Sequence, residues 1–142
     1  MTNEEKSKFE RLLDQEADKF LIIKQKTREG IMEATAGLSR RAFDDGEMAD
    51  LNHRLAVNTG LCQSSDQILK KIDMAKQGIK NGTYGQCLNP LGNSACEISI
   101  SLRRLEAVPW EDKCLSCQKE EERSASEEQF LKKEKRKVIT GN

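Results

Sequence analysis

The stretch that decides the fold is Cys87-Leu-Asn-Pro-Leu-Gly-Asn-Ser-Ala-Cys96, which seventeen intervening residues separate from Cys114-Leu-Ser-Cys117. Two cysteines separated by two residues form a typical metal-binding knuckle, and this spacing between the pairs lets two short loops deliver thiolates to one zinc ion. Four thiolates leave no coordination position for water, so such a site is structural and not catalytic. The sequence therefore predicts one structural zinc ion bound by Cys87, Cys96, Cys114 and Cys117.

The first cysteine pair is wider than the usual knuckle, because eight residues separate Cys87 from Cys96. Two doublings of loop length cost only about 1.2 kcal/mol in closure entropy, whereas a structural zinc contributes roughly 10–16 kcal/mol. The longer loop is therefore compatible with the site. Two alternatives stay open: unligated cysteines in a loop-rich domain, and a redox pair formed by Cys114 and Cys117. The redox reading lacks the βαβ setting of such pairs and leaves two cysteines unexplained.

The composition favours a thin helical architecture over a thick globular core. Of the 142 residues, 36% are apolar, 4% are aromatic and 34% are charged. Helical hairpins and coiled coils tolerate such a composition because they bury only a narrow seam, and a bound metal adds folding free energy that a thin core lacks.

The charge balance and the apolar runs exclude several classes of function. Lysine plus arginine equals aspartate plus glutamate, 24 against 24, which disfavours direct DNA binding through phosphates. The longest apolar run, Phe20-Leu-Ile-Ile23, is far too short for a membrane span, and the N-terminus shows no signal region. We expect a cytoplasmic protein, in a compartment where clustered cysteines favour zinc over disulfides.

Two long helices are expected in the first half, from about Asn3 to Leu38 and from about Glu47 to Lys80, the second ending at Asn81-Gly82. Apolar or small residues recur at helical steps in the first at Phe9, Leu13, Phe20, Ile23, Thr27, Ile31 and Ala34, and in the second at Ile68, Ile72, Ala75 and Ile79. The short turn between the helices requires antiparallel packing, so residues 1–80 are predicted to form a coiled-coil hairpin with its tip at about 44–49.

The turn signal is Asp44-Asp45-Gly46, where either aspartate can cap the second helix. A cysteine module is expected over residues 81–118, and a helix from about Lys119 to Lys137 within the C-terminal segment 119–142. Arg103 and Arg104 are expected either to balance the charge of a four-thiolate zinc site or to pair with glutamates of the helices. The predicted fold class is all-α: a long antiparallel hairpin, a small four-cysteine zinc module and a C-terminal helix.

Three segments together resemble the DksA/TraR family of bacterial transcription regulators: Gly82-Thr-Tyr-Gly-Gln-Cys87, Ile100-Ser-Leu-Arg-Arg-Leu-Glu-Ala-Val-Pro109 and Cys114-Leu-Ser-Cys117. The order of parts, helix, tip, helix, cysteine module and C-terminal helix, also matches. Counting back from Cys87 without a gap, the family's tip motif D-x-x-D-x-A falls on Asp44-Asp-Gly-Glu-Met-Ala49.

The resemblance implies a protein that binds RNA polymerase and not DNA. In the family, the hairpin enters the secondary channel, its acidic tip destabilises open promoter complexes, and the zinc module and C-terminal helix rest on the channel rim. The tip residues carry over as Asp44, Glu47 and Ala49, with Glu47 one methylene longer than the family's aspartate. The plainer reading is that these acids only cap a helix and face water, a role for which Asp45 is the stronger candidate.

Many family members act with the alarmone ppGpp in the stringent response. The resemblance places the family's nucleotide-binding lysine at Lys71, but two basic positions are replaced by Val108 and Gln118. Each lost cation removes charge-assisted contacts of roughly 1.5–3 kcal/mol, so we expect weak synergy with ppGpp, and Lys71 is equally consistent with a solvated lysine.

The leading hypothesis is thus a monomeric, non-enzymatic regulator of RNA polymerase. The alternative is a zinc-stapled coiled-coil adaptor or dimerisation protein without direct action on the polymerase active centre. An enzyme ranks third, because the sequence offers neither a nucleophile–base constellation nor an open metal position.

Overall fold

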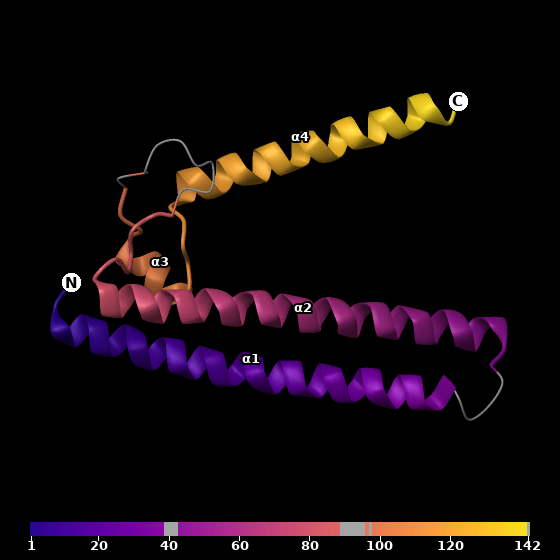
Figure 1. Cartoon of the computed structure of the whole chain (residues 1–142), viewed down its shortest axis with the longest axis horizontal. Coiled ribbons are helices and arrows are strands. Elements are labelled where there is room, and N and C mark those ends of the chain that lie inside the picture. The colour runs from indigo at the N-terminus through magenta and orange to yellow at the C-terminus, as the bar shows by residue number, and fades with distance from the viewer. Residues whose placement is uncertain (39–42, 89–95, 97, 142) are drawn as a thin grey trace. The chain divides into compact units, whose positions relative to one another are not determined.

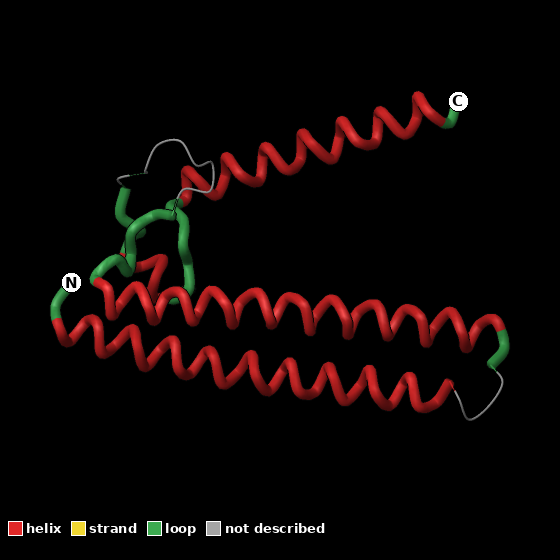
Figure 2. The backbone as a smooth tube through the Cα atoms, viewed as in Figure 1, coloured by secondary structure: helices red, strands yellow, loops and turns green. Residues whose placement is uncertain are grey.

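The computed structural model describes residues 1–38, 43–88, 96 and 98–141. It contains four α-helices, α1 (Asn3–Leu38), α2 (Asp45–Asn81), α3 (Leu102–Ala107) and α4 (Leu115–Ile139), within these ranges (Figure 1). The chain divides into two units, Met1–Tyr84 and Gly85–Asn142, which are described separately. Among the described residues there is no strand beyond one isolated bridge (Figure 2), so the expectation of an all-α fold is confirmed.

The first unit is an antiparallel hairpin of α1 and α2, as predicted. Two ion pairs fix its register: Asp14 with Lys76 at 2.6 Å, and Lys24 with Asp66 at 2.5 Å. From the first pair to the second, the residue number rises by ten along α1 and falls by ten along α2, as an antiparallel arrangement requires. The turn lies at the opposite end of the hairpin from the N-terminus (Figure 1). Residues 39–42 of this turn lie outside the described residues.

Hydrogen bonds and backbone conformation define where α1 begins and where α2 ends. The backbone N–H of Glu5 donates to the Thr2 hydroxyl at 3.2 Å, and the Thr2 N–H donates to the Glu5 carboxylate at 2.8 Å. This capping box satisfies amide groups that have no partner inside the first turn of α1. Helix α2 ends at its C-cap, Gly82, whose φ of 78° is the left-handed conformation favoured by glycine.

The seam between the helices is apolar at its base and polar in its middle. The buried apolar side chains are Phe9, Leu13, Ala34, Leu51, Ile72 and Ile79. Thr27 and Ser65 are also buried, and each hydroxyl donates to a carbonyl of its own helix, Lys24 at 2.9 Å and Leu61 at 2.8 Å. The predicted seam is wrong at Ile23, which is 39% exposed because the buried face of α1 passes through Thr27 and Lys24 instead.

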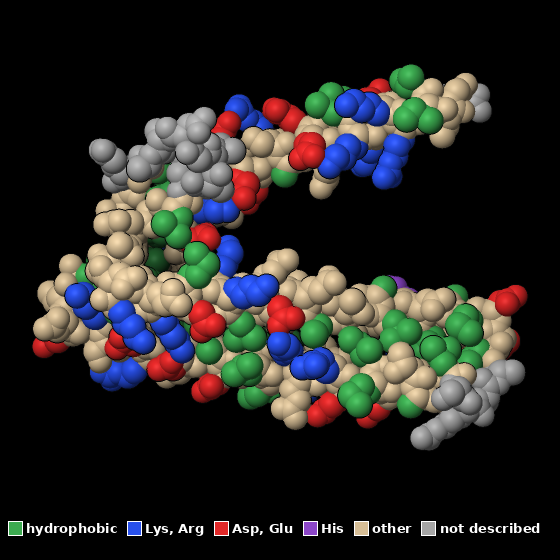
Figure 3. Space-filling view, viewed as in Figure 1, with side chains coloured by type: hydrophobic (Ala, Val, Ile, Leu, Met, Phe, Trp, Pro, Cys, Tyr) green, Lys and Arg blue, Asp and Glu red, His purple; other side chains and the backbone are tan. Residues whose placement is uncertain are grey.

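The second unit contains two helices that differ from expectation. The six-residue α3 was not predicted, because fewer than two turns carry no readable periodicity; its Leu105 is buried. Helix α4 begins at Leu115, four residues before the predicted start, because Cys114 already adopts the extended conformation of an N-cap. No residue of α4 is buried, and lysine and arginine side chains gather along its C-terminal half (Figure 3).

Candidate metal centre and hairpin tip

Backbone hydrogen bonds between residues 85–87 and 98–100 hold Cys87 in the second unit. Gln86 and Ser99 form an antiparallel bridge, and the Ile100 N–H donates to the Gly85 carbonyl at 2.7 Å. Gly85 has a φ of 84°, the left-handed conformation that turns the chain into this ladder. Because the Ile98 carbonyl also accepts from the Cys87 N–H, at 3.4 Å, residues 98–100 run alongside residues 85–87.

The second knuckle is tied to the first by two backbone donors. The Leu88 N–H donates to the Asp112 carbonyl at 2.7 Å, and the Cys114 N–H donates to the Cys87 Sγ at 3.1 Å. Cys114 then caps α4, and Cys117 lies in the first turn of that helix. The helix start therefore presents both cysteines of the knuckle to the sulfur of Cys87.

The four predicted ligands meet in one cluster. The Sγ atoms of Cys87, Cys96, Cys114 and Cys117 all lie within 4.8 Å of one another, and Cys96 and Cys114 are 3.9 Å apart. Zinc–sulfur bonds of about 2.3 Å in a tetrahedron place the sulfurs roughly 3.8 Å apart, so the spacing fits a zinc ion. Disulfide sulfurs lie only about 2.05 Å apart, and all five cysteines of the chain are free thiols.

The thiols influence one another's ionisation in opposite directions. The Cys117 backbone N–H, aided by the surrounding thiols, lowers the pKa of Cys114 to about 7. The pKa of Cys117 is raised to about 12, first by the adjacent Cys114 sulfur and then by that of Cys87. Burial raises the pKa of Cys87. The cluster thus favours ionisation of Cys114 and opposes ionisation of Cys117 and Cys87. A divalent cation compensates the charge of several thiolates at once.

The predicted tip residues lie at the start of α2. The Asp44 carboxylate accepts from the Glu47 N–H at 2.7 Å, and the Glu47 carboxylate accepts from the Asp44 N–H at 3.2 Å. Both acids are therefore members of a capping box, and Asp44, Glu47 and Ala49 are all exposed. The choice of Asp45 as the capping residue was wrong, because Asp45 is the first residue inside the helix.

The residues considered for a nucleotide divide between the two units. Lys71 lies in the middle of α2 and is half-buried, whereas Val108 and Gln118 belong to the second unit. The Gln118 side chain accepts a hydrogen bond from the Arg104 guanidinium. Cys62 lies on α2, half-buried, and is not a member of the cysteine cluster.

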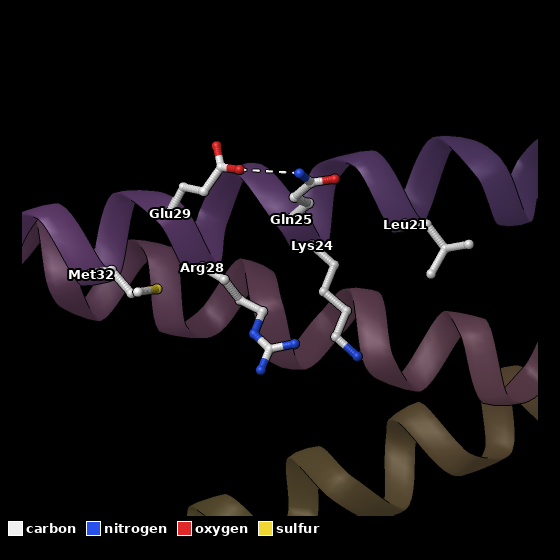
Figure 4. A pocket seen from close by; sticks show the side chains of 6 residues that line it. All are labelled: Leu21, Lys24, Gln25, Arg28, Glu29 and Met32. Atoms are coloured by element: carbon white, nitrogen blue, oxygen red, sulfur yellow. Dashed lines mark hydrogen bonds between the residues drawn. The ribbon is translucent and has the colours of Figure 1, made fainter.

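Sequence reasoning missed surface depressions on two helices. One, of about 410 Å³, is lined by α1 residues from Leu21 to Met32, with Lys24 and Arg28 between them and Gln25 bonded to Glu29 at 3.1 Å (Figure 4). Another, of about 450 Å³, is lined on α4 by Ser126, Glu127, Phe130 and Leu131. These surfaces have no motif, and only the exposure of their apolar side chains reveals them.

No described helix combines the length and the apolar character required to cross a bilayer.

Two comparisons with known proteins bear on this arrangement. No family model matches the chain. The RNA polymerase-binding transcription factor DksA of Buchnera aphidicola subsp. Acyrthosiphon pisum (strain APS) is 36% identical over 53 residues, 37% of this chain. The chain spans 31% of the length of that curated relative. The solved structure of transcription factor DksA2 from Pseudomonas aeruginosa covers 87% of this chain and 88% of its own, with a TM-score of 0.66 at 19% identity.

These findings support the resemblance to the DksA/TraR family. The 53-residue match shows similarity in sequence, and the match to DksA2 shows similarity in fold over most of the chain. The resemblance predicted from the cysteine core and the Arg-Arg-Leu-Glu-Ala segment is thereby confirmed.

Proposed function

We propose that this chain regulates transcription initiation by binding RNA polymerase, with the hairpin inserted in the secondary channel and its acidic tip altering open-complex stability. The observation that carries the proposal is the pair of exposed carboxylates, Asp44 and Glu47, at the end of a long hairpin of DksA-like fold. The curated relative is an RNA polymerase-binding factor by name. The proposed role is regulatory and not enzymatic, and its location is the cytoplasm.

The capping box gives the tip acids a defined geometry. Each carboxylate bonds the backbone of the other residue, so both side chains lose rotational freedom at the first turn of α2. A negative pair held in this way projects charge without an entropic cost at the moment of contact. The small side chain of Ala49 leaves the adjacent helical surface open, which suits a tip that enters a narrow channel.

The metal ion in this proposal is structural. Zinc held by Cys87, Cys96, Cys114 and Cys117 would fix the module that carries α4, and it would supply folding free energy rather than chemistry. The chain's own contribution is the backbone ladder and the helix start that bring the four sulfurs together.

Weak dependence on ppGpp belongs to the same proposal. Lys71 is the candidate contact for the nucleotide, but Val108 offers no charge, and Gln118 already accepts from Arg104. A polyphosphate binds mainly through charge-assisted hydrogen bonds, and these two positions supply no cation. We therefore expect similar effects on transcription with and without ppGpp.

The decisive experiment neutralises the tip while leaving the capping box intact. Asparagine caps a helix as well as aspartate, and glutamine replaces glutamate in a capping box. We expect the double variant Asp44→Asn/Glu47→Gln to bind core polymerase like the wild type but no longer to shorten open-complex lifetime. Asp45→Asn, which neutralises the neighbouring exposed acid, is the control. Undiminished activity of the double variant in a reconstituted assay contradicts the tip mechanism.

A second candidate function is that of a zinc-stapled adaptor or dimerisation protein. It is favoured by α4, where Phe130, Val138 and Ile139 are 64%, 79% and 84% exposed. Such apolar exposure is typical of surfaces that contact a partner. Sedimentation separates the two functions: the polymerase regulator is expected to be a monomer, and a stable dimer at micromolar concentration favours the adaptor.

A further inference from the structure

Arg104 reaches both sides of the cysteine knuckle from α3. Its Nη2 donates to the Glu111 carboxylate at 3.0 Å and also to the Gln118 side-chain oxygen. Glu111 lies three residues before Cys114, and Gln118 directly follows Cys117. One guanidinium therefore bridges the segment that enters the knuckle and the helix that leaves it.

This bridge is shielded from water and firmly anchored. The side chains of Arg104 and Glu111 are 24% and 14% exposed, so solvent weakens their attraction less than it weakens a surface pair. Leu105, the next residue of α3, is 1% exposed and fixes the helix that carries the arginine. Among the described residues, the Arg104 Nε is the buried side-chain nitrogen or oxygen without a hydrogen-bond partner, and both hydrogen bonds of the bridge come from Nη2.

A second ion pair spans the same knuckle. Lys113 Nζ lies 2.5 Å from the Glu121 carboxylate, and the Lys113 side chain is only 15% exposed. Lys113 directly precedes Cys114, and Glu121 lies one helical turn beyond Cys117. Two independent links thus join the entry segment to the first two turns of α4, and the arginine link alone also includes α3.

We propose that Arg104 is a positioning residue for the metal centre. It holds residues 111–118 in the turn that points Cys114 and Cys117 toward Cys87, so that the thiol cluster is assembled before an ion binds. The inference rests on the proposed zinc site and adds a determinant of its affinity. Outer-shell contacts of this kind change metal affinity by about 10–100-fold when removed.

The neighbouring arginine provides a matched control. Arg103 has the same charge on the same short helix, but it is exposed, whereas Arg104 is half-buried. Arg104→Met keeps the length and apolar stem of the side chain and removes the fork, and Arg103→Met removes an equal charge. Arg104→Lys keeps the charge but replaces the planar guanidinium with an ammonium group. Gln118→Leu removes one arm of the bridge and provides a second variant should Arg104→Met fold poorly.

The test measures zinc affinity and release in the full-length reduced chain with a chromogenic chelator as competitor. We expect Arg104→Met to raise the zinc dissociation constant by about 10–100-fold, Gln118→Leu and Arg104→Lys by less, and Arg103→Met by less than twofold. Cobalt substitution should give the absorption bands of a four-thiolate site in every variant, because the ligands are unchanged.

The outcomes separate this inference from the proposed function. Wild-type protein that takes up no zinc or cobalt overturns both the proposed zinc site and the role of Arg104, and leaves the proposed role of the tip to its own test. Wild-type protein that binds zinc, together with an Arg104→Met variant whose affinity and release rate are unchanged, overturns only the role of Arg104. That role is also overturned if Arg104→Met lowers the melting temperature of the metal-free chain and leaves zinc affinity intact, since such a result describes a merely structural contact.

Discussion

The aromatic rings of Phe9 and Tyr84 pack against each other with their centroids 5.3 Å apart and their planes tilted by 52°. Phe9 lies in the second turn of α1, and Tyr84 follows the end of α2, so the contact closes the base of the hairpin. Burial also raises the pKa of the Tyr84 hydroxyl, as expected for a phenol withdrawn from water.

Phe9→Ala should lower the free energy of unfolding of the hairpin strongly. Phe9 is 2% exposed, and removing a buried phenylalanine side chain costs about 3–5 kcal/mol. Urea unfolding followed by circular dichroism measures the change. Ile22→Ala, at a side chain that is 54% exposed, should alter stability by less than about 0.5 kcal/mol. Equal effects of the two variants would contradict the assigned seam.

Two glycine substitutions, one within α2 and one at its C-cap, should change stability in opposite directions. Gly82→Ala forces an alanine into the left-handed conformation at φ 78° and should cost about 1 kcal/mol. Gly60→Ala, in the helix interior where an added methyl meets no atom within 4 Å, should stabilise by up to about 1 kcal/mol. Thermal melts of the two variants against wild type test the prediction, which fails if both move in the same direction.

The Lys24–Asp66 pair should make hairpin stability depend on pH in the acid range. The hydrogen bond from Lys24, supported by the charges of Lys24, Lys70 and Arg28, lowers the pKa of Asp66 below its ordinary value of 3.8. A lowered folded-state pKa contributes stability above the unfolded value and loses it as the pH falls through the folded one. The stability difference between wild type and Asp66→Asn should therefore be constant near neutrality and shrink below about pH 4. Asp73→Asn is the control acid on the same helix.

The capping role of Asp44 can be measured apart from any role in transcription. Asp44→Ala removes the acceptor for the Glu47 N–H and should cost about 0.5–2 kcal/mol of helix stability. Asp44→Asn should cost only a few tenths of a kcal/mol, because asparagine caps equally well. Hydrogen exchange at the first turn of α2 reports the difference. Identical exchange in the two variants would argue against the capping box.

Removal of metal should loosen one unit and spare the other. We expect a strong chelator to increase amide exchange at Cys87, Ile100 and Cys114, whose backbone bonds depend on the assembled module. Amides of Leu13 and Ile72, in the buried seam of the hairpin, should keep their protection. Loss of protection in both units on chelation is the contrary result.

Much of this architecture could be predicted from the residues, and the failures have physical causes. The bounds of α1 follow from its periodicity, and the cysteine cluster follows from its spacing. Helix α3 escaped because six residues are too few for a period. The start of α4 was misplaced because a cysteine serves as the N-cap, a role that propensity assigns to small polar residues. Ile23 was placed in the seam because it lies at helical steps from Phe20 and Thr27, but the half-buried Lys24 takes the seam position between them.

The hydroxyl groups of Thr27 and Ser65 bond only to their own helices, so the middle of the hairpin has no polar link from one helix to the other through these side chains. At the base of the hairpin, the buried apolar side chains are large: Phe9, Leu13, Ile72 and Ile79. Between the middle and the tip, the buried apolar side chains among the described residues are Ala34 and Leu51. The buried apolar side chains are therefore larger at the base of the hairpin than near its tip, so we expect the tip end to resist separation of the helices less. We therefore expect a load applied near Asp44 to separate the two helices before it disturbs the packing of Phe9.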